Sequence, residues 1–370
     1  MKAEHIPLLR CVDCTGALKL VNAVFVGDVV DCGRLVCQDC GRSYPIIDTV
    51  AVCFRDDVVL DYLSQREVDF ITAKGWNDCL VSRGGGKAQW HAAQKSVADN
   101  WAYQWDVLAD DWRAEDFAGP GLLSAKAFWN FVQIEPQEVL GKKVLVTCGG
   151  LGREARHVVD AGAAEVMVNE IGVEIYKIRK NVPGADDKLI LLRSDACHLP
   201  LGPGVADIAI CDHALQHIPN HVDAFQELAA KARSGGQVII CVYSWENNAI
   251  MTHMVEPSKQ LIHRLPLKGQ RVLALPLALA VFALTRGLYA PLGRFAPGVG
   301  CRLPLFEHMR FWSEFPFSVL WLSIFDLLHA PVSYHFRKAE VEGLSASAGL
   351  RTRRLVNTNG TLWSLVAVKP

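Results

Sequence analysis

The hydrophobic pattern from residue 142 onward alternates between short apolar runs and stretches with helical spacing. Strands are predicted over residues 143–148, 165–169, 189–192, 206–211 and 237–242. Helices are predicted over residues 153–161, 171–181 and 222–233. This alternation predicts a parallel sheet with helices on both faces, and such sheets bind ligands beyond the C-terminal ends of their strands.

Two later β runs, residues 351–356 and 362–368, flank Asn359-Gly360 and predict a C-terminal hairpin. A long insertion, residues 246–336, precedes them, with apolar helices expected over residues 272–284, 311–321 and 320–328. The run 272–284 contains Pro276, and no run of roughly 18 or more apolar residues predicts a membrane span. The insertion is expected either to pack on itself as a small helical subdomain or to cover the strand ends as a lid or a substrate wall.

Four cysteines near the N-terminus form two CxxC pairs, Cys11 with Cys14 and Cys37 with Cys40. Two such turns facing each other predict a tetrahedral site for Zn²⁺. Four thiolates leave no open coordination position, so this zinc is expected to be structural. Cys32 lies outside both pairs, and a redox dithiol is the alternative interpretation.

Composition narrows the class of protein. The formal net charge is −1, which disfavours a nucleic-acid partner. The N-terminus lacks the apolar core of a signal peptide, and cysteines such as Cys211 and Cys241 lie in apolar runs, as free thiols do in a reducing compartment. A cytoplasmic protein is therefore predicted, and the sequence leaves its oligomeric state open.

Polar and glycine-rich positions follow the predicted strands. The first strand ends in Cys148-Gly149-Gly150-Leu151-Gly152, where glycines let a ligand approach the backbone and the next helix favours a negative group. Glu170 ends the second strand, where a carboxylate can accept both hydroxyls of a ribose. Asp195-Ala196 follows the third strand, Asp212 and His213 the fourth, and Ser234-Gly235-Gly236 is expected to be the turn before the fifth.

This series resembles the class I S-adenosylmethionine (SAM) methyltransferases over residues 140–245 and 337–370. The resemblance implies a Rossmann-like sheet with a C-terminal antiparallel hairpin, SAM as cofactor, and cofactor contacts from Cys148, Gly149, Gly150, Gly152, Glu170, Asp195, Ala196 and Asp212. Residues 6–54 resemble the Trm112-like zinc ribbon in Leu8-Leu9-Arg10-Cys11, Leu35-Val36-Cys37 and Arg42-Ser43-Tyr44-Pro45-Ile46-Ile47-Asp48. The expected units are a ribbon (1–55), a helical linker (56–135), a methyltransferase core (136–245 and 337–370) and a helical insertion or lid (246–336).

The first strand departs from the family pattern. Val146 stands where the family has an acid that orders the loop, and Cys148 replaces the first glycine. An altered or lost use of SAM is therefore an alternative. A dinucleotide-binding dehydrogenase is another, although only Ala155 could serve as its third glycine.

The linker contains Gly84-Gly85-Gly86, expected as a flexible break, and the aromatic segment Asn100-Trp101-Ala102-Tyr103-Gln104-Trp105. Ribbon-bearing methyltransferases have a similar stretch before the catalytic domain. Its aromatic residues are expected either to clamp a helix onto the domain or to cover the cofactor.

Methyl transfer needs alignment of the reactants, and a base only where the acceptor must lose a proton. His213 and His217 follow the fourth strand, Tyr243 the fifth, and His335 could close the opposite side, so these four are the catalytic candidates. The insertion suggests a small lipophilic or aromatic substrate, with arginines available for a phosphate or carboxylate, and a shallow membrane contact. A non-methylating enzyme, a non-catalytic activator and an RNA methyltransferase are the competing functions.

Overall fold

A computed structural model describes residues 1–82, 89–107 and 124–370, and it contains one eleven-stranded sheet. The strand order is β1-β2-β3-β4-β7-β6-β5-β8-β9-β11-β10. The bounds are β1 Leu18–Val26, β2 Val29–Cys37, β3 Ser43–Ile47, β4 Val50–Val52, β5 Lys143–Thr147, β6 Glu165–Glu170, β7 Leu189–Arg193, β8 Ala206–Asp212, β9 Ala232–Tyr243, β10 Arg351–Thr358 and β11 Leu362–Val368.

The predicted core is confirmed. Strands β7, β6, β5, β8 and β9 are parallel, and β11 joins β9 antiparallel before pairing with β10. One detail differs: Ser234-Gly235-Gly236 was expected as a turn but lies inside β9. The ladder with β8 shifts register between Ala206 and Ile208, and Gly235 has a φ of 73°. The glycines therefore form a local irregularity that strand pairing continues across.

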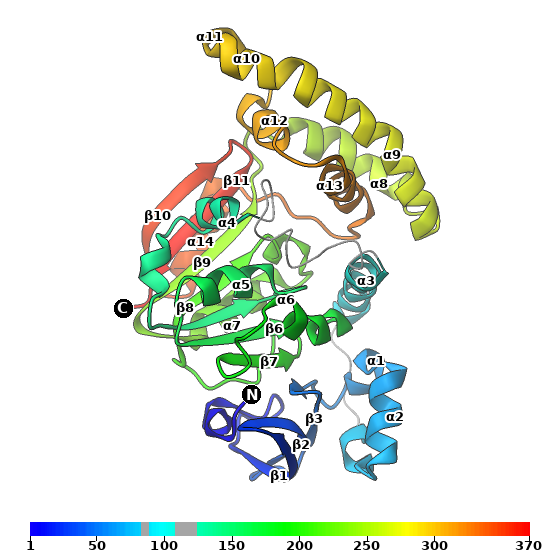
Figure 1. The fold of residues 1–370 in the computed structure, drawn as a ribbon, viewed down its shortest axis with the longest axis vertical. Helices are drawn as coiled ribbons and strands as arrows, with labels where there is room; N and C mark the ends of the chain where they lie inside the picture. Colours follow the sequence, from blue (N-terminus) through cyan, green and yellow to red (C-terminus); the bar gives the residue numbers. More distant parts are fainter. Residues whose placement is uncertain (83–88, 108–123) are drawn as a thin grey trace.

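Helices cover both faces of this sheet (Figure 1). One face packs against α7 (His221–Lys231) and α14 (Lys338–Ser347), and the other against α4 (Ala125–Val132), α5 (Arg153–Asp160), η7 (Val173–Lys177) and α6 (Ile178–Asn181). Short 3-10 turns, η6 (Pro136–Val139) and η8 (Leu215–His217), complete the core. The expected helix over 171–181 is thus two shorter elements.

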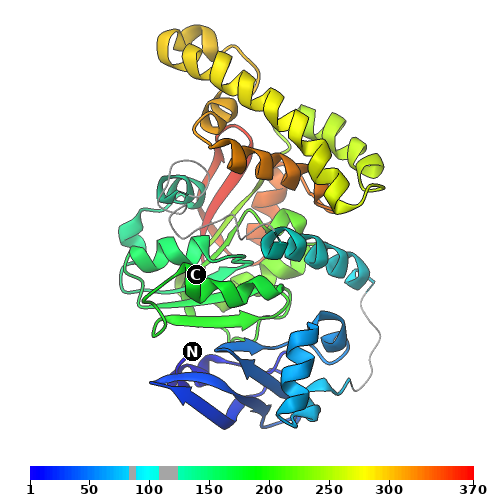
Figure 2. The ribbon, with the colours of Figure 1, turned by 45° about the vertical axis from the view of Figure 1, so that its right-hand side comes forward.

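The N-terminal unit, η1 (Ala3–Leu8) and β1 to β4, extends the same sheet. Val50, Ala51 and Val52 of β4 pair in parallel with Leu191, Leu192 and Arg193 of β7. The backbone N–H of Cys53 then donates to the carbonyl of Arg193 at 2.9 Å. The cysteine-rich unit and the core therefore share a backbone ladder as well as side-chain contacts (Figure 2).

The linker elements are α1 (Val59–Tyr62), α2 (Gln65–Ala73), η2 (Asn77–Leu80), α3 (His91–Ala102) and η3 (Tyr103–Val107). Glu67 of α2 is fully buried, accepts from Tyr176 Oη at 2.7 Å and forms an ion pair with Arg193 of β7. These contacts attach the linker to the sheet. The expected break at Gly84-Gly85-Gly86 lies outside the described residues.

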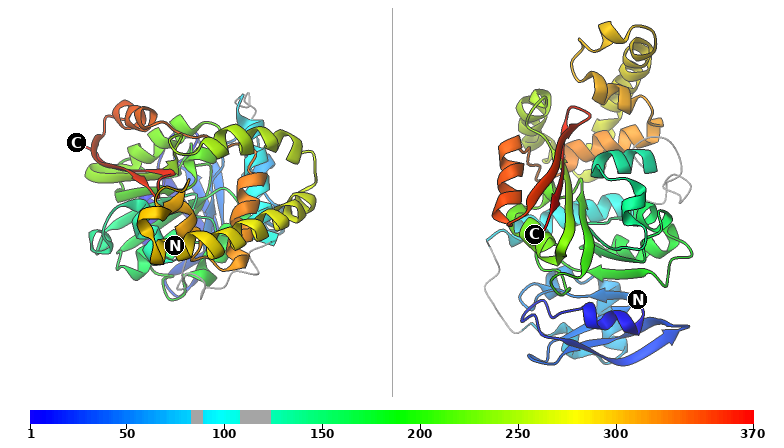
Figure 3. Two further views of the ribbon diagram at one scale, coloured as in Figure 1. Left: turned by 90° about the horizontal axis from the view of Figure 1, so that it is seen from above. Right: turned by 90° about the vertical axis from the view of Figure 1, so that its left-hand side faces the viewer.

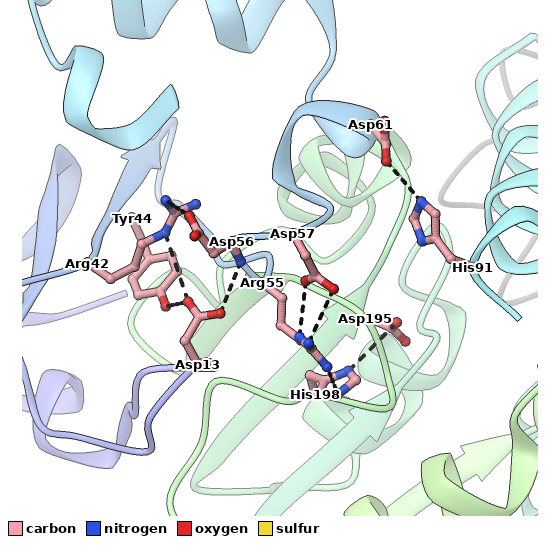
Figure 4. A network of polar contacts seen from close by, with 10 residues as sticks. All are labelled: Asp13, Arg42, Tyr44, Arg55, Asp56, Asp57, Asp61, His91, Asp195 and His198. Carbon is pink, nitrogen blue, oxygen red and sulfur yellow. Dashed lines mark hydrogen bonds and ion pairs between the residues drawn. The ribbon is translucent and has the colours of Figure 1, made fainter. Parts of the chain in front are cut away.

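A network of polar contacts adds to this attachment (Figure 4). Arg42 Nη1 lies 2.5 Å from Asp56 Oδ1, and Arg55 Nη1 lies 3.2 Å from His198 Nε2 of the core. His91 Nε2 lies 2.9 Å from Asp61 Oδ2. Side chains of the ribbon, the linker and the core therefore meet in one region.

The insertion forms the end of the molecule opposite the ribbon (Figures 1 and 3). Its elements are η9 (Met251–Val255), α8 (Glu256–Ile262), α9 (Leu267–Leu284), η10 (Thr285–Tyr289), α10 (Ala290–Phe295), α11 (Pro297–Gly300), α12 (Phe306–Trp312) and α13 (Phe317–His329). A single helix over 311–321 was wrong, because α12 ends at Trp312 and α13 begins after Pro316. Proline at that boundary cannot continue the ladder of the preceding helix.

The expectation that no segment could span a membrane also needs correction. The helical run Leu267–Phe295 has 29 residues and a mean hydropathy of 1.8 in its most apolar window, of which 22% is buried. By length and composition alone it could cross a bilayer. The helix passes through Pro276 without interruption, as the predicted helix over 272–284 also does, but it begins earlier, at Leu267.

Candidate active site

The four predicted zinc ligands come together in the N-terminal unit. Cys11 Sγ lies 3.7 Å from Cys40 Sγ, and Cys14 Sγ lies 3.4 Å from Cys37 Sγ. All four sulfur atoms lie within 4.8 Å of one another. Zn–S bonds of about 2.3 Å in a tetrahedron place sulfur atoms roughly 3.8 Å apart, so the cluster fits one zinc ion.

The backbone around this cluster is also shaped for it. A Cβ on Gly16 would lie 2.9 Å from Cys37 Sγ and 2.4 Å from Asp39 Oδ2, so only glycine fits there. Tyr44 Oη lies 3.0 Å from Cys11 Sγ and holds that side chain in place. Cys32, by contrast, is buried in the core and does not belong to the cluster.

The second site lies at the C-terminal ends of the parallel strands, where a cavity of about 430 Å³ opens. Ten of the twelve predicted catalytic and cofactor residues line it: Cys148, Gly149, Gly150, Glu170, Ala196, Asp212, His213, His217, Tyr243 and His335. Gly152 and Asp195 do not line it. The fold therefore brings together residues that the sequence separates by almost 190 positions.

The turn after β5 forms the floor of this cavity. Cys148 has a φ of 55° and Gly150 a φ of 49°, both in the left-handed region. A Cβ on Gly150 would meet nothing closer than Trp105 Nε1 at 3.9 Å, so this backbone faces open space. Gly152 has a φ of 90° and packs against Ile178. The backbone therefore needs glycine at this position whether or not a ligand binds. The neighbouring Cys211 thiol and burial raise the pKa of the Cys148 thiol, which keeps it protonated.

Glu170 ends β6 beside this turn. Its Oε2 accepts from the backbone N–H of Gly150 at 2.8 Å, and its Oε1 from those of Ile171 and Gly172 at 2.6 and 3.1 Å. Burial raises the pKa of this carboxyl, while the three N–H donors oppose that shift. The acid is therefore held at the rim of the cavity by the backbone itself.

Asn169 and Asp195 complete this side. Asn169 donates to Ser194 O and Oγ at 2.7 Å, while its buried Oδ1 has no protein partner and the residue lines the cavity. A buried acceptor without a partner indicates room for a ligand's donor group. Asp195 instead accepts from the backbone N–H of Cys197 at 2.9 Å and lines a small neighbouring pocket with His198 (Figure 4).

An ion-pair network connects the start of α5 with the end of β8. Arg153, the first residue of α5, lies 2.6 Å from Asp212 Oδ2 and also pairs with Glu154. Asp212 Oδ1 lies 2.7 Å from His213 Nδ1. Asp212, His213 and Cys241 have ligand atoms close enough for a metal ion, but the Arg153 guanidinium already neutralises that carboxylate. The sequence resemblance did not reveal this network, since its charged residues lie on two different elements.

The four catalytic candidates have distinct protonation states. Burial lowers the pKa of His213, but the Asp212 carboxylate outweighs it and raises the pKa to about 10. Burial lowers the pKa of His217 to about 3 and that of His335 to about 4. His217 Nδ1 lies 2.7 Å from the carbonyl of Val332 and must donate to it, which leaves Nε2 as an acceptor. Burial also raises the pKa of Tyr243. At neutral pH His213 is thus a cation, and His217 and His335 are neutral.

The insertion and the linker supply the remaining walls. Apolar side chains from the insertion line one side: Leu277, Val281, Leu305, Met309, Phe311 and Trp312. Trp101 and Trp105 of the linker stack with ring centroids 6.1 Å apart, and both line the cavity. Trp101 also lies 5.0 Å from the ring of His217. The aromatic segment therefore lies at the cavity rather than only holding α3 on the domain.

Asp326 of α13 lines the cavity, although it was not among the predicted catalytic or cofactor residues. Its Oδ1 is buried without a partner, and burial raises the pKa of the carboxyl well above its usual range. It is therefore a neutral acid that can donate a hydrogen bond into the cavity. The signal was present, because Asp326 is the one charged residue in the apolar helix Phe317–His329.

Comparisons with known proteins agree with this geometry. Residues 145–240 match the family described as a methyltransferase domain, and residues 2–48 match the Trm112p-like protein family. Demethylmenaquinone methyltransferases of Mycobacterium bovis and Mycobacterium tuberculosis are 27% identical over 110 residues, 30% of this chain and 44% of theirs. The chain thus spans less than half the length of these relatives.

Solved structures with low identity also align with the chain. A complex of the Haloferax volcanii Trm112 methyltransferase activator with a methyltransferase aligns at 14% identity and a TM-score of 0.42, over 74% of this chain and 95% of that one. A Burkholderia thailandensis 1,6-didemethyltoxoflavin-N1-methyltransferase aligns at 10% identity and a TM-score of 0.42, over 77% and 92%. On the two family matches, residues 2–48 are a Trm112p-like segment and residues 145–240 are a methyltransferase domain.

Proposed function

We propose that this protein transfers a methyl group from SAM to a small lipophilic or aromatic acceptor. The observation that carries the proposal is the composition of a single cavity. One side carries the Gly149-Gly150 turn and the Glu170 carboxylate, and the other carries the apolar wall of the insertion. A polar cofactor and an apolar acceptor would therefore meet in one cavity.

On the cofactor side, the residues present fit SAM. The turn after β5 is open, Asn169 Oδ1 lacks a partner, and Glu170 is fixed at the cavity rim. When bound, SAM supplies an electrophilic methyl group on a sulfonium. Glu170 would accept hydrogen bonds from the ribose hydroxyls, and the N–H groups at the start of α5 favour a negative group. The aromatic rings of Trp101 and Trp105 would exclude water.

On the acceptor side, three polar groups stand among apolar ones. His217 Nε2 can accept a hydrogen bond from an acceptor hydroxyl or amine, and His335 is a second neutral imidazole. Protonated Asp326 can donate to a carbonyl. His213 is a cation at neutral pH, so its role is electrostatic and it does not remove a proton. A ring that carries oxygen groups fits this arrangement.

The mycobacterial relatives support the acceptor class. They are named for demethylmenaquinone, a lipophilic ring with oxygen substituents, although their similarity covers 110 residues. The apolar wall here comes from the insertion, outside the 145–240 family match. The acceptor of this chain is therefore proposed from its own side chains. All twelve cysteines are free, which supports a reducing, cytoplasmic location as part of the proposal.

Calorimetry with SAM and S-adenosylhomocysteine tests the cofactor half. Heat with both ligands is expected, and absence of heat with either would leave a non-catalytic scaffold. Transfer of labelled methyl to a panel of quinols and phenols, with RNA as a further substrate, tests the acceptor half. If the protein binds the cofactor but methylates none of the ring compounds, the proposed acceptor class is wrong. Transfer to RNA would then favour an RNA methyltransferase, and no transfer at all would favour a non-methylating reaction.

A further inference from the structure

The outer side of α9 exposes apolar side chains that the described residues leave uncovered. Val272 and Leu279 of α9 and Phe295 of α10 have exposed fractions of 69%, 53% and 77%. On the inner side, Ala274 and Ala278 are completely buried in a cluster with side chains of α13. Other exposed apolar residues of the insertion are Met254, Leu261, Leu265, Leu273, Leu277, Leu284, Leu288 and Val299. A surface of this kind indicates an interaction site.

Basic side chains stand at both ends of this apolar side. Lys268, Val272 and Leu279 are spaced by four and seven residues, which places them on one side of the helix. Lys268 and Arg286, near the two ends of α9, are exposed. Long basic side chains can keep their charges in water or at phosphates while their stems lie along apolar surface. The arrangement is typical of a helix that lies in a membrane interface.

The charge of the whole segment is one-sided. Between Pro257 and Phe306 the chain has seven Lys or Arg residues and no Asp or Glu, although the complete protein has a net charge of −1. Five of the seven are exposed: Arg264, Lys268, Arg286, Arg294 and Arg302. Within the described ranges none of these five forms an ion pair with a carboxylate. A second copy docking symmetrically on this surface would bring like charges together, whereas anionic lipid headgroups would complement it.

We propose that α9 and its basic flanks dock on an anionic lipid bilayer. The insertion occupies the end of the molecule away from the ribbon, so a bilayer can reach α9 without meeting the zinc cluster (Figure 3). Leu277 and Val281 of the same helix line the cavity. The docked helix would therefore stand between the bilayer and the cavity. The docking itself does not depend on the reaction proposed above.

Cosedimentation of the purified, zinc-loaded full chain with phosphatidylcholine vesicles, with and without phosphatidylglycerol, tests the proposal. Binding is expected only with the anionic lipid and should weaken in high salt. Val272→Glu with Leu279→Glu should reduce binding at least about tenfold. Each of Arg264→Gln and Lys268→Gln should reduce it about fivefold. The matched control is Val26→Glu, because Val26 is 67% exposed on the opposite end and Val272 69%.

Thermal melting of every variant checks that its fold is retained. Equal binding of the wild type and the Val272→Glu, Leu279→Glu variant would overturn the proposal, as would equal binding to neutral vesicles. Sedimentation equilibrium without lipid tests whether a second copy of the chain binds this surface instead. A dimer that the same double substitution dissociates would assign the surface to a second copy of the chain and would also overturn the proposal.

Discussion

The Glu170 carboxylate accepts a hydrogen bond from the backbone N–H of Gly150 at 2.8 Å, which ties the end of β6 to the turn after β5. The same carboxylate is held by two further N–H groups of its own turn. Its position at the cavity is therefore set before any ligand binds. This relationship connects the two sequence features on which the cofactor assignment depends.

Removal of this carboxylate should weaken the cofactor site. Glu170→Ala is expected to reduce SAM affinity by about 1–3 kcal/mol, roughly 5- to 150-fold, since charged hydrogen bonds to the ribose are lost. Calorimetry with S-adenosylhomocysteine measures the change. Glu165→Ala, at the other end of the same strand, serves as the control and should leave affinity unchanged. An unaltered affinity in Glu170→Ala would remove the ribose assignment.

The left-handed backbone at Cys148 predicts a stabilising substitution. Cys148→Gly should raise the free energy of unfolding by about 0.5–1 kcal/mol, because glycine adopts a φ of 55° without steric cost. Cys148→Val should lower it by about 1–2 kcal/mol, since a β-branched residue is disfavoured there. Chemical denaturation followed by fluorescence measures both. The opposite order of the two variants would contradict this account.

The Asp212–His213 pair predicts a pH dependence. The pKa of His213 is raised to about 10, so its contribution to stability is fully present below about pH 6.5. It is lost as the pH rises toward 10. The difference in unfolding free energy between the wild type and His213→Gln should therefore shrink over this window. In an Asp212→Asn background the loss between about pH 6.5 and 10 should disappear, because burial then lowers the pKa of His213. A loss that persists over this window would show that Asp212 does not cause the raised pKa.

Asp326 is expected to lower the free energy of unfolding while it contributes to binding of the acceptor. Asp326→Leu removes a buried carboxyl oxygen without a partner and is expected to raise the free energy of unfolding by about 1–3 kcal/mol. Because the donor to the acceptor is lost, KM for the acceptor should rise while SAM affinity stays unchanged. Asp326→Asn keeps a donor and should restore much of the KM. If Asp326→Leu is more stable but keeps the KM of the wild type for the acceptor, Asp326 does not bind the acceptor.

Removal of zinc should loosen the sheet beyond the ribbon. Chelation, or Cys37→Ser, is expected to cost several kcal/mol of stability, since the free energy of metal binding contributes to the folding of the N-terminal unit. Hydrogen exchange should rise in β4 and in its partner β7, whose ladder joins the two domains, and not in β10 and β11. Cys301→Ser, an exposed cysteine outside the cluster, is the control. Faster exchange confined to residues before Val50 would contradict the coupling.

Local pattern predicted much of the fold. Four of the five core strands were predicted to within one residue, because their apolar runs are short and are bounded by glycine or acidic residues. The fifth, β9, begins at Ala232, five residues before the predicted start. The hairpin was predicted from Asn359-Gly360, which have φ values of 52° and 76°. The insertion was predicted less well, since uniformly apolar stretches carry no periodicity to mark where helices such as α12 and α13 end.

The amino-acid sequence by itself determined the four-cysteine cluster, the succession of core strands along the chain and the residues that follow them, because CxxC spacing and strand-end motifs are local. Only the tertiary structure decided that β4 continues the core sheet, that Arg153 meets Asp212, and that Asp326 faces the cavity uncharged. It also decided that His213 is a cation and His217 a neutral base. These properties arise from contacts between distant segments and from burial. Neither the contacts nor the burial can be predicted from a single short segment of the sequence.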